Sequence, residues 1–156
     1  MSDVGAAEPR ERVLLDAMVL VAGLTSTREP ASHSRRLIEL AANGRFDLVV
    51  TDTLLAETFE VLVNPKFIGR LETDDAIEVL SAIAGMAAVH VHDAGTPHPP
   101  LTADPDDDFL AAAALATGAL LVTRDDRAGF SGVIGLRIGR PGTALRLLGV
   151  IDSVTP

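Results

Sequence analysis

Hydrophobic residues along this chain fall into two alternating patterns. The first is a short apolar run bounded by polar or turn residues, which is typical of buried strands; it covers residues 13–16, 46–51, 88–92, 119–123 and 133–139. The second is a longer segment with helical spacing and helix-end signals; it covers residues 32–44, 53–62, 73–87, 104–118 and 141–148. Strands that alternate with helices form parallel sheets. We therefore expect an α/β fold, a three-layer α/β/α sandwich with a mainly parallel central sheet of about five strands.

Length and composition indicate one globular domain. The chain has 156 residues, 47% of them hydrophobic, and we expect a flexible N-terminal tail at 1–11, a single domain at 12–150 and a C-terminal tail at 151–156. The lack of cysteine excludes disulfides and zinc–thiolate sites. The first residues lack the apolar core of a signal peptide, and the apolar run 109–122 is too short to span a bilayer. We expect a cytoplasmic protein without membrane contact.

The charge balance is acidic. Thirteen basic and 22 acidic residues give a formal charge of −9, which argues against a protein that coats nucleic acid through a basic surface. Aromatic residues make up 3%, so platforms for stacking bases are not expected either. Six of the acids gather at positions 104, 106, 107, 108, 125 and 126. A bound cation would reverse the sign of the charge there, so a phosphate substrate remains compatible with this chain.

Four acids stand where the predicted strands end. Asp16 ends the first strand, Glu57 lies one turn into the helix after the second, Asp107 begins the helix after the third, and Asp125 follows the fourth. The carboxyl ends of parallel strands meet at one edge, where such sheets bind their ligands. Crowded carboxylates raise each other's pKa, and a hard divalent cation removes that cost. A cation held there would activate water against a phosphodiester.

At these residues the chain resembles the PIN-domain family of ribonucleases. Four motifs follow in the family's order and spacing, over residues 13 to about 148: VLLD at 13–16, LLAETFEVL at 54–62, DPDDDFLAAAALA at 104–116 and VTRD at 122–125. The likeness is closest to the VapC-type toxin components of bacterial toxin–antitoxin pairs.

The resemblance implies an endoribonuclease that cleaves RNA with metal-activated water, and Mg²⁺ or Mn²⁺ as its cofactor. It implies a catalytic and metal-binding tetrad of Asp16, Glu57, Asp107 and Asp125. Nearby polar residues are supporting candidates: Thr123, Asp104 and Asp126. A small antitoxin protein as partner and a homodimer are implied by the same resemblance.

One departure from the family leaves other functions open. Family members have a small polar residue and then Asn after the first Asp, whereas this chain has Ala17 and Met18, and we expect Met18 to fill the core. A PIN fold that has lost its nuclease and acts as a binding module is therefore an alternative. A phosphohydrolase of haloacid-dehalogenase type is less favoured, because that family needs a second Asp where Met18 stands and a downstream lysine, and Lys66 is the single lysine.

Basic residues near the acidic motifs are candidates for weak RNA contacts: Arg124, Arg127, Lys66, Arg70 and Arg28. Two histidines, His90 and His92, lie two residues apart on a predicted strand, so their side chains share a face. A metal site there needs a third ligand, which the sequence does not show. We therefore expect ordinary packing or solvation for the two histidines.

Overall fold

The computed structural model describes residues 10–27, 31–95, 100–102, 104–124, 127–130 and 132–150. The expected tails, apart from residues 10 and 11, lie outside these ranges. Three residues that the sequence singles out also lie outside these ranges: Arg28, Asp125 and Asp126. Of Arg127, the backbone is described and the side chain is not.

Five parallel strands form one sheet in the order β3-β2-β1-β4-β5. The central strand β1 (Arg12–Leu15) pairs with β2 (Asp47–Thr51) on one side and with β4 (Leu120–Val122) on the other. The edge strands are β3 (Val89–Val91), beside β2, and β5 (Arg137–Gly139), beside β4. The expected α/β sandwich with a parallel sheet of five strands is confirmed.

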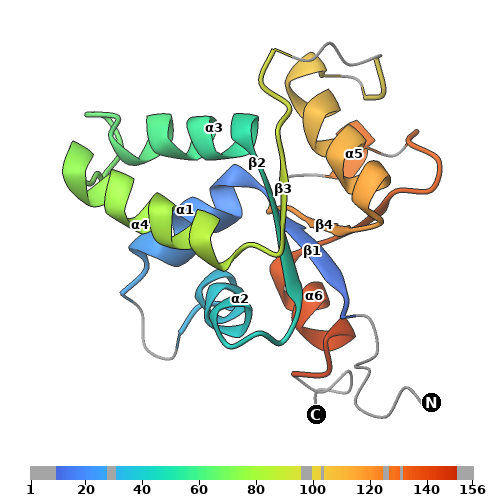
Figure 1. Cartoon of the computed structure of the whole chain (residues 1–156), viewed down its shortest axis with the longest axis horizontal. Coiled ribbons are helices and arrows are strands. Elements are labelled where there is room, and N and C mark those ends of the chain that lie inside the picture. The colour runs from blue at the N-terminus through green and yellow to red at the C-terminus, as the bar shows by residue number, and fades with distance from the viewer. Residues whose placement is uncertain are drawn as a thin grey trace, which may run out of the picture.

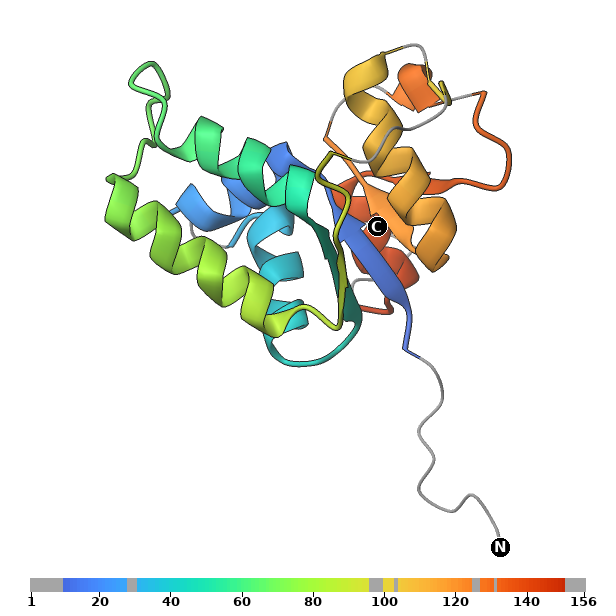
Figure 2. The same ribbon diagram turned by 45° about the horizontal axis from the view of Figure 1, so that its top comes forward.

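Helices cover both faces of the sheet. Figure 1 shows α1 to α4 gathered on one side of the strands and α5 on the other, and Figure 2 shows the same separation after rotation. α6 packs against α2. The helices are α1 (Ala17–Thr25), α2 (His33–Ala42), α3 (Asp52–Leu62), α4 (Thr73–Met86), α5 (Pro105–Thr117) and α6 (Pro141–Leu147), with a 3₁₀ turn η1 (Arg127–Phe130). Within the described ranges, none of them is long and apolar enough to cross a membrane.

Helix α1 is the element that the hydrophobic pattern did not assign. It is apolar on nearly every side, so no helical period marks it, and such a helix belongs in the interior. It packs against both α2 and α3. Gly23 permits the close contact with α2, because a Cβ at this position would lie 2.5 Å from Cδ1 of Ile38 and 2.9 Å from the carbonyl oxygen of Ser34.

The parallel pairing brings the carboxyl ends of all five strands to one edge. Leu15 lies beside Val122, and Thr51 lies beside Val91, so the strands end at nearly the same level. The residues that follow the strands are therefore neighbours along this edge. In strand order from β3 to β5 they are His92, Asp52, Asp16, Thr123 with Arg124, and Arg140.

Candidate active site

Asp16 is a buried carboxylate at the centre of the carboxyl edge. It follows β1 and is the N-cap of α1, with Oδ1 accepting a hydrogen bond of 2.6 Å from the backbone N–H of Ala17. Oδ2 accepts a 3.0 Å hydrogen bond from the hydroxyl of Thr123, which is fully buried at the end of β4. Only 8% of Asp16 is exposed. Burial of a carboxylate is costly unless its oxygens have partners, and these two donors hold the side chain in one orientation.

Two acidic residues in the first turn of α5, Asp107 and Asp108, have different environments. Asp108 is buried, and its Oδ1 accepts hydrogen bonds from the backbone N–H groups of Leu101 and Thr102 and from the Thr102 hydroxyl. Asp108 therefore anchors the chain that enters the helix. Asp107, half-buried, lies beside η1, where a Cβ on Gly129 would be 3.7 Å from its Oδ2.

Two more of the expected carboxylates lie at or near the beginning of a helix. Asp104 is exposed, and its backbone carbonyl accepts from the N–H of Asp107, 2.9 Å away, in the first turn of α5. Glu57 is half-buried on the second turn of α3, the helix that packs against α1. Asp125 and Asp126 lie outside the described residues, so the geometry of the tetrad is defined for Asp16, Glu57 and Asp107 alone.

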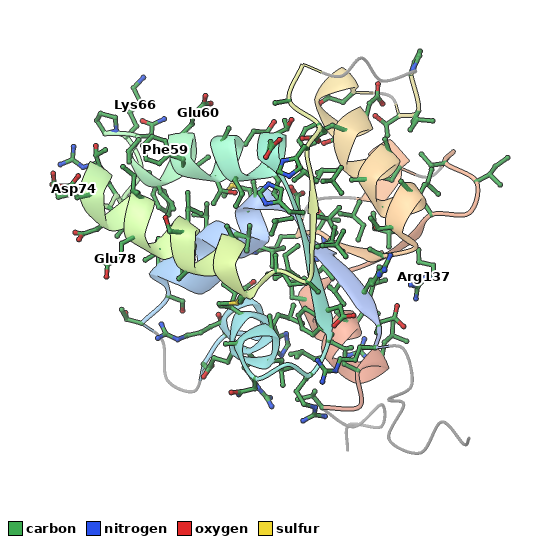
Figure 3. The ribbon with its side chains drawn as sticks, viewed as in Figure 1. Phe59, Glu60, Lys66, Asp74, Glu78 and Arg137 are labelled. Carbon is green, nitrogen blue, oxygen red and sulfur yellow. The ribbon has the colours of Figure 1, made fainter. Side chains whose placement is uncertain are left out.

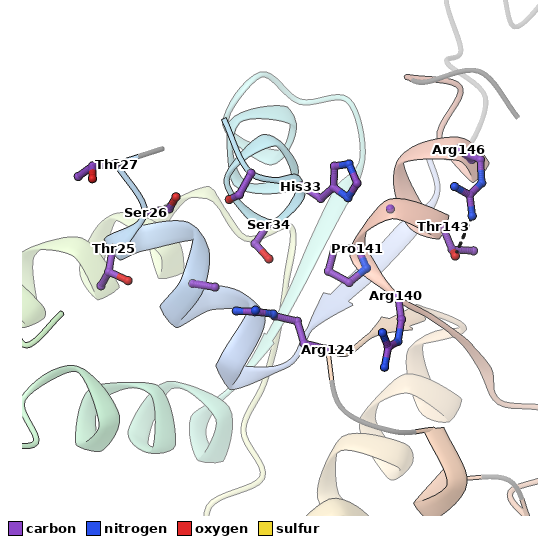
Figure 4. A pocket seen from close by; sticks show the side chains of 13 residues that line it. Thr25, Ser26, Thr27, His33, Ser34, Arg124, Arg140, Pro141, Thr143 and Arg146 are labelled. Carbon is purple, nitrogen blue, oxygen red and sulfur yellow. Dashed lines mark hydrogen bonds between the residues drawn. The ribbon is translucent and has the colours of Figure 1, made fainter. Parts of the chain in front are cut away.

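A cavity of about 740 Å³ adjoins this edge between α1, α2 and α6. Arg124 enters it from the end of β4, Arg140 from the end of β5, and Arg146 from α6, as Figure 4 shows. Serine and threonine hydroxyls and His33 complete much of its wall, and none of the described residues that line it is acidic. On a chain of net charge −9, this concentration of guanidinium groups fits an anion.

Arg124 and Arg140 have no carboxylate partner within the described part of the chain. Arg146 donates a 3.2 Å hydrogen bond to the hydroxyl of Thr143 in its own helix. The cavity therefore offers guanidinium groups that no neighbouring acid among the described residues neutralises. Of its arginines, sequence reasoning singled out Arg124 and missed Arg140, because the pairing of β4 with β5 brings them together.

Two other basic candidates lie away from the edge. Lys66 follows the far end of α3, and Figure 3 shows it at the outer end of the α3–α4 pair. The 11 residues of α3 put that end about 16 Å from the start of the helix. Arg70 lies in the same loop, 3.9 Å from Glu72. The structure thus separates both residues from Asp16.

Met18 does not fill the core as the sequence suggested. It is 38% exposed on the first turn of α1, while Ala17 and Val19 on either side of it are buried. The expectation was wrong because α1 has no regular apolar stripe from which an inner and an outer side can be distinguished. Met18 is two residues from Asp16, at the position where a PIN-type Asn is expected.

A second polar cluster lies at the β3 end of the same edge. Asp52 accepts hydrogen bonds from His90 Nε2, 2.7 Å from Oδ1, and from His92 Nδ1, 3.2 Å from Oδ2. The hydrogen bond from His90 lowers the pKa of Asp52 below its usual value of 3.8, although desolvation opposes the shift, and His92 lowers this pKa further. Sequence reasoning found the two histidines and missed Asp52. The residue that caps α3 is Thr51, whose hydroxyl accepts from the N–H of Leu54.

The donors at the centre of the edge fit a hard divalent cation. Asp16 offers carboxylate oxygens at a strand end, and Mg²⁺ and Mn²⁺ prefer oxygen ligands from one or two carboxylates together with water. The cluster of Asp52 with two imidazoles has a different donor set. The edge therefore carries three chemically distinct zones: imidazole with carboxylate, carboxylate, and guanidinium.

Comparison with known proteins agrees with this architecture. Similar solved structures are VapBC2 from Rickettsia felis bound to a DNA fragment from their promoter (16% identity, TM-score 0.54, covering 83% of this chain and 98% of that chain) and PAE2754 from Pyrobaculum aerophilum (20%, 0.54, 92% and 100%). DNA-bound VapBC from Salmonella typhimurium is also similar (14%, 0.52, 84% and 98%). At these identities the likeness concerns the fold. A search of curated proteins found no match.

The sequence itself matches the PIN domain profile over residues 12–127. This match covers most of the chain and includes the segments that carry Asp16, Glu57 and Asp107. As the motifs predicted, the chain belongs to the PIN-domain family.

Proposed function

We propose that this chain is a metal-dependent endoribonuclease and the toxin of a toxin–antitoxin pair. The observation that carries the proposal is the buried Asp16 carboxylate, held by Thr123 at the carboxyl edge of a PIN-domain sheet. The proposed metal ligands are Asp16, Glu57, Asp107 and Asp125. Mg²⁺ or Mn²⁺ bound by them would supply Lewis acidity and a bound water of lowered pKa.

The chain's own residues have distinct tasks in this proposal. The Thr123 hydroxyl and the Ala17 N–H orient the two oxygens of Asp16, so the ligand is in place before a cation arrives. Asp108 anchors the start of α5, and Asp107 is thereby held beside η1. Asp104 and Asp126 are proposed as supporting residues.

The proposed substrate is single-stranded or looped RNA. Its phosphates would enter the cavity lined by Arg124, Arg140 and Arg146, which opens at the same sheet edge as Asp16. Guanidinium groups bind phosphate oxygens with paired N–H donors, and these are not neutralised by acids in the described part of the cavity wall. Arg28 and Arg127 are close in sequence to the cavity residues Thr27 and Arg124, and we keep them as proposed RNA contacts.

The toxin assignment rests on the kind of complex in which similar folds occur. Two of the similar structures are named as VapBC complexes. For this chain we propose a small antitoxin protein as partner, a homodimer and a cytoplasmic location. Light scattering on the purified chain tests the dimer. Coexpression with the product of a short reading frame directly upstream tests the partner, which should bind the chain and suppress its RNA cleavage.

RNA cleavage by purified protein tests the nuclease. With Mn²⁺ the chain should cleave single-stranded RNA, and EDTA should stop the reaction. Asp16→Asn should lower the rate by more than about 100-fold, because the loss of outer-shell partners alone costs about 10- to 100-fold at metal sites. Asn still caps helices well, so the variant should fold.

Asp74→Asn is the matched control, since Asp74 is exposed on α4 at the outer end of the molecule (Figure 3). It should keep the parent's activity. Equal cleavage by Asp16→Asn, Asp74→Asn and the parent would identify a contaminating nuclease and refute the proposal.

A PIN fold that binds without cutting is the second candidate. Ala17 and Met18 replace the polar residues expected after Asp16, and Met18 is exposed there without a hydrogen-bonding group beyond a weak acceptor. Met18→Asn distinguishes the two functions. If it creates RNA cleavage that the parent lacks, the parent is a binding module; if both cleave, the nuclease assignment holds.

A further inference from the structure

Three metal-ligating side chains converge at the β3 end of the sheet edge, outside the proposed tetrad. His90 lies in β3 and His92 directly follows it, so their side chains leave the backbone on the same face. Each directs a ring nitrogen to the Asp52 carboxylate. The rings stack with centroids 4.4 Å apart and planes at 20°. One ligand atom from each of the three residues lies within 4.8 Å of the other two.

We propose that Asp52, His90 and His92 bind a divalent transition metal ion of the zinc type. Imidazole nitrogens with one carboxylate suit Zn²⁺ and neighbouring first-row ions, whereas Mg²⁺ takes oxygen ligands. Two histidines at alternate positions of a strand act as a chelate, because their side chains leave the backbone on the same face. Three protein ligands leave a fourth position for water.

The observed distances are close to those that such an ion needs. Tetrahedral bonds of 2.0–2.1 Å place ligand atoms about 3.3 Å from one another. Nδ1 of His92 already lies 3.3 Å from Oδ1 and 3.2 Å from Oδ2 of Asp52. Nε2 of His90, at 2.7 Å from Oδ1, has to withdraw by roughly 0.6 Å, which side-chain rotation supplies at this exposed position.

The backbone holds the three ligands in register without a metal. Thr51 pairs with Val91 in the sheet, so the residues that follow them, Asp52 and His92, leave the two strands at the same level. Asp93, the buried residue that follows His92, accepts hydrogen bonds from the N–H and the hydroxyl of Thr53, each 3.0 Å long. These contacts fasten the chain after β3 to the first turn of α3, and the ligands are thereby preorganised.

This site is separate from the acidic one. The two histidines belong to β3 and its end, two strand spacings or about 10 Å from β1, while Asp52 follows β2, the strand next to β1. The donor sets differ as well, since Asp16 lies among carboxylates and hydroxyls while Asp52 faces two imidazoles. The proposal does not depend on nuclease activity. A metal bound here would join the short edge strand β3 to the start of α3.

Calorimetric titration of the untagged chain with ZnCl₂ in excess Mg²⁺ tests the site. The parent should bind one Zn²⁺ that Mg²⁺ does not displace. His92→Ala and Asp52→Asn should each weaken Zn²⁺ binding by more than about 10-fold, because the loss of outer-shell partners alone costs about 10- to 100-fold at metal sites. His92 is 76% exposed, so its replacement does not threaten the fold. Two control variants, Asp16→Asn at the acidic site and His33→Ala at the arginine cavity, should bind Zn²⁺ as the parent does.

Three outcomes would overturn the proposal. They are the absence of Zn²⁺ binding by the parent, unchanged binding by both His92→Ala and Asp52→Asn, and loss of binding in Asp16→Asn, which would place the ion at the acidic site. Co²⁺ gives an independent readout: the parent should show the visible absorption of tetrahedral Co²⁺, and His92→Ala should lose it.

Discussion

The hydrogen bond between Thr123 and Asp16 should contribute more to the free energy of unfolding than most single polar contacts in this protein. Thr123→Val removes the hydroxyl and keeps the shape of a fully buried side chain. The bond is 3.0 Å long and ends on a carboxylate that is 92% removed from solvent, with its other oxygen bonded to the N–H of Ala17. Water cannot easily replace the missing donor at such a site.

A hydrogen bond to a charged group contributes about 1.5–3 kcal/mol to the free energy of unfolding. For a chain of this size, each kcal/mol corresponds to about 2–4 °C in Tm, so Thr123→Val should lower Tm by about 3–12 °C. Thr58→Val is the matched control. Thr58 is equally buried, but its hydroxyl donates 2.8 Å to the carbonyl of Leu54 within α3, and that carbonyl keeps a helical partner. Removal of this hydroxyl should cost at most about 1 kcal/mol.

Thermal and urea unfolding of both variants, without metal, measure this difference. RNA cleavage at increasing Mn²⁺ measures the second consequence. Thr123→Val should need about 10-fold more Mn²⁺ for half-maximal rate, because Oδ2 of Asp16 has lost the hydroxyl that orients it, while Thr58→Val should not. Equal loss of stability in the two variants, with the same Mn²⁺ requirement, would refute the role given to Thr123.

Three further results are expected. Gly23→Ala should destabilise the fold by about 1–3 kcal/mol in urea unfolding, because its Cβ would lie 2.9 Å from a backbone oxygen of α2. The control Gly85→Ala, whose Cβ would have nothing within 4 Å, should stabilise the fold by about 0.5–1 kcal/mol, and equal effects of the two variants would contradict the close α1–α2 contact. The pKa of Asp52 is lowered in the fold, so the Asp52 carboxylate stabilises the fold above pH 3.8, and this stabilisation is lost as pH falls through the folded pKa. The Tm difference between the parent and Asp52→Asn should therefore shrink over that acid range, and a constant difference would show that the carboxylate is unpaired. Arg140→Ala should weaken RNA binding and reduce the slope of log K against log salt by about 0.7 for each phosphate that the variant no longer neutralises, and an unchanged slope would exclude the cavity from the RNA path.

Much of the fold could be predicted because each element carries a local signal. The five strands are short apolar runs, and five of the six α-helices show a cap, a stop or an apolar period in the sequence. α1 escaped because a helix buried on nearly every side has no period to detect. The same lack of a period explains the wrong expectation for Met18, which is exposed while its neighbours are buried.

The candidate site could also be predicted only in part, namely where a local pattern marks the residue. Asp16 was recognisable from the chain alone, because an acid between Leu15 and an apolar segment is costly without a partner. The partner of Asp16, Thr123, is 107 residues away in the sequence. The family motif made Thr123 a candidate, but its hydrogen bond to Asp16 follows only from the pairing of β1 with β4. Distant pairings of this kind cannot be read from local patterns.

The sequence by itself determined the five strands, five of the six α-helices, the parallel sheet and the acids at its strand ends, since these follow from local patterns and from charges placed beside apolar runs. Only the tertiary structure decided which side chains meet. Asp52 joins His90 and His92 across about 40 residues because β2 pairs with β3, and Arg140 joins Arg124 because β4 pairs with β5. The physical reason is strand order, which long-range packing selects and which no short stretch of sequence encodes.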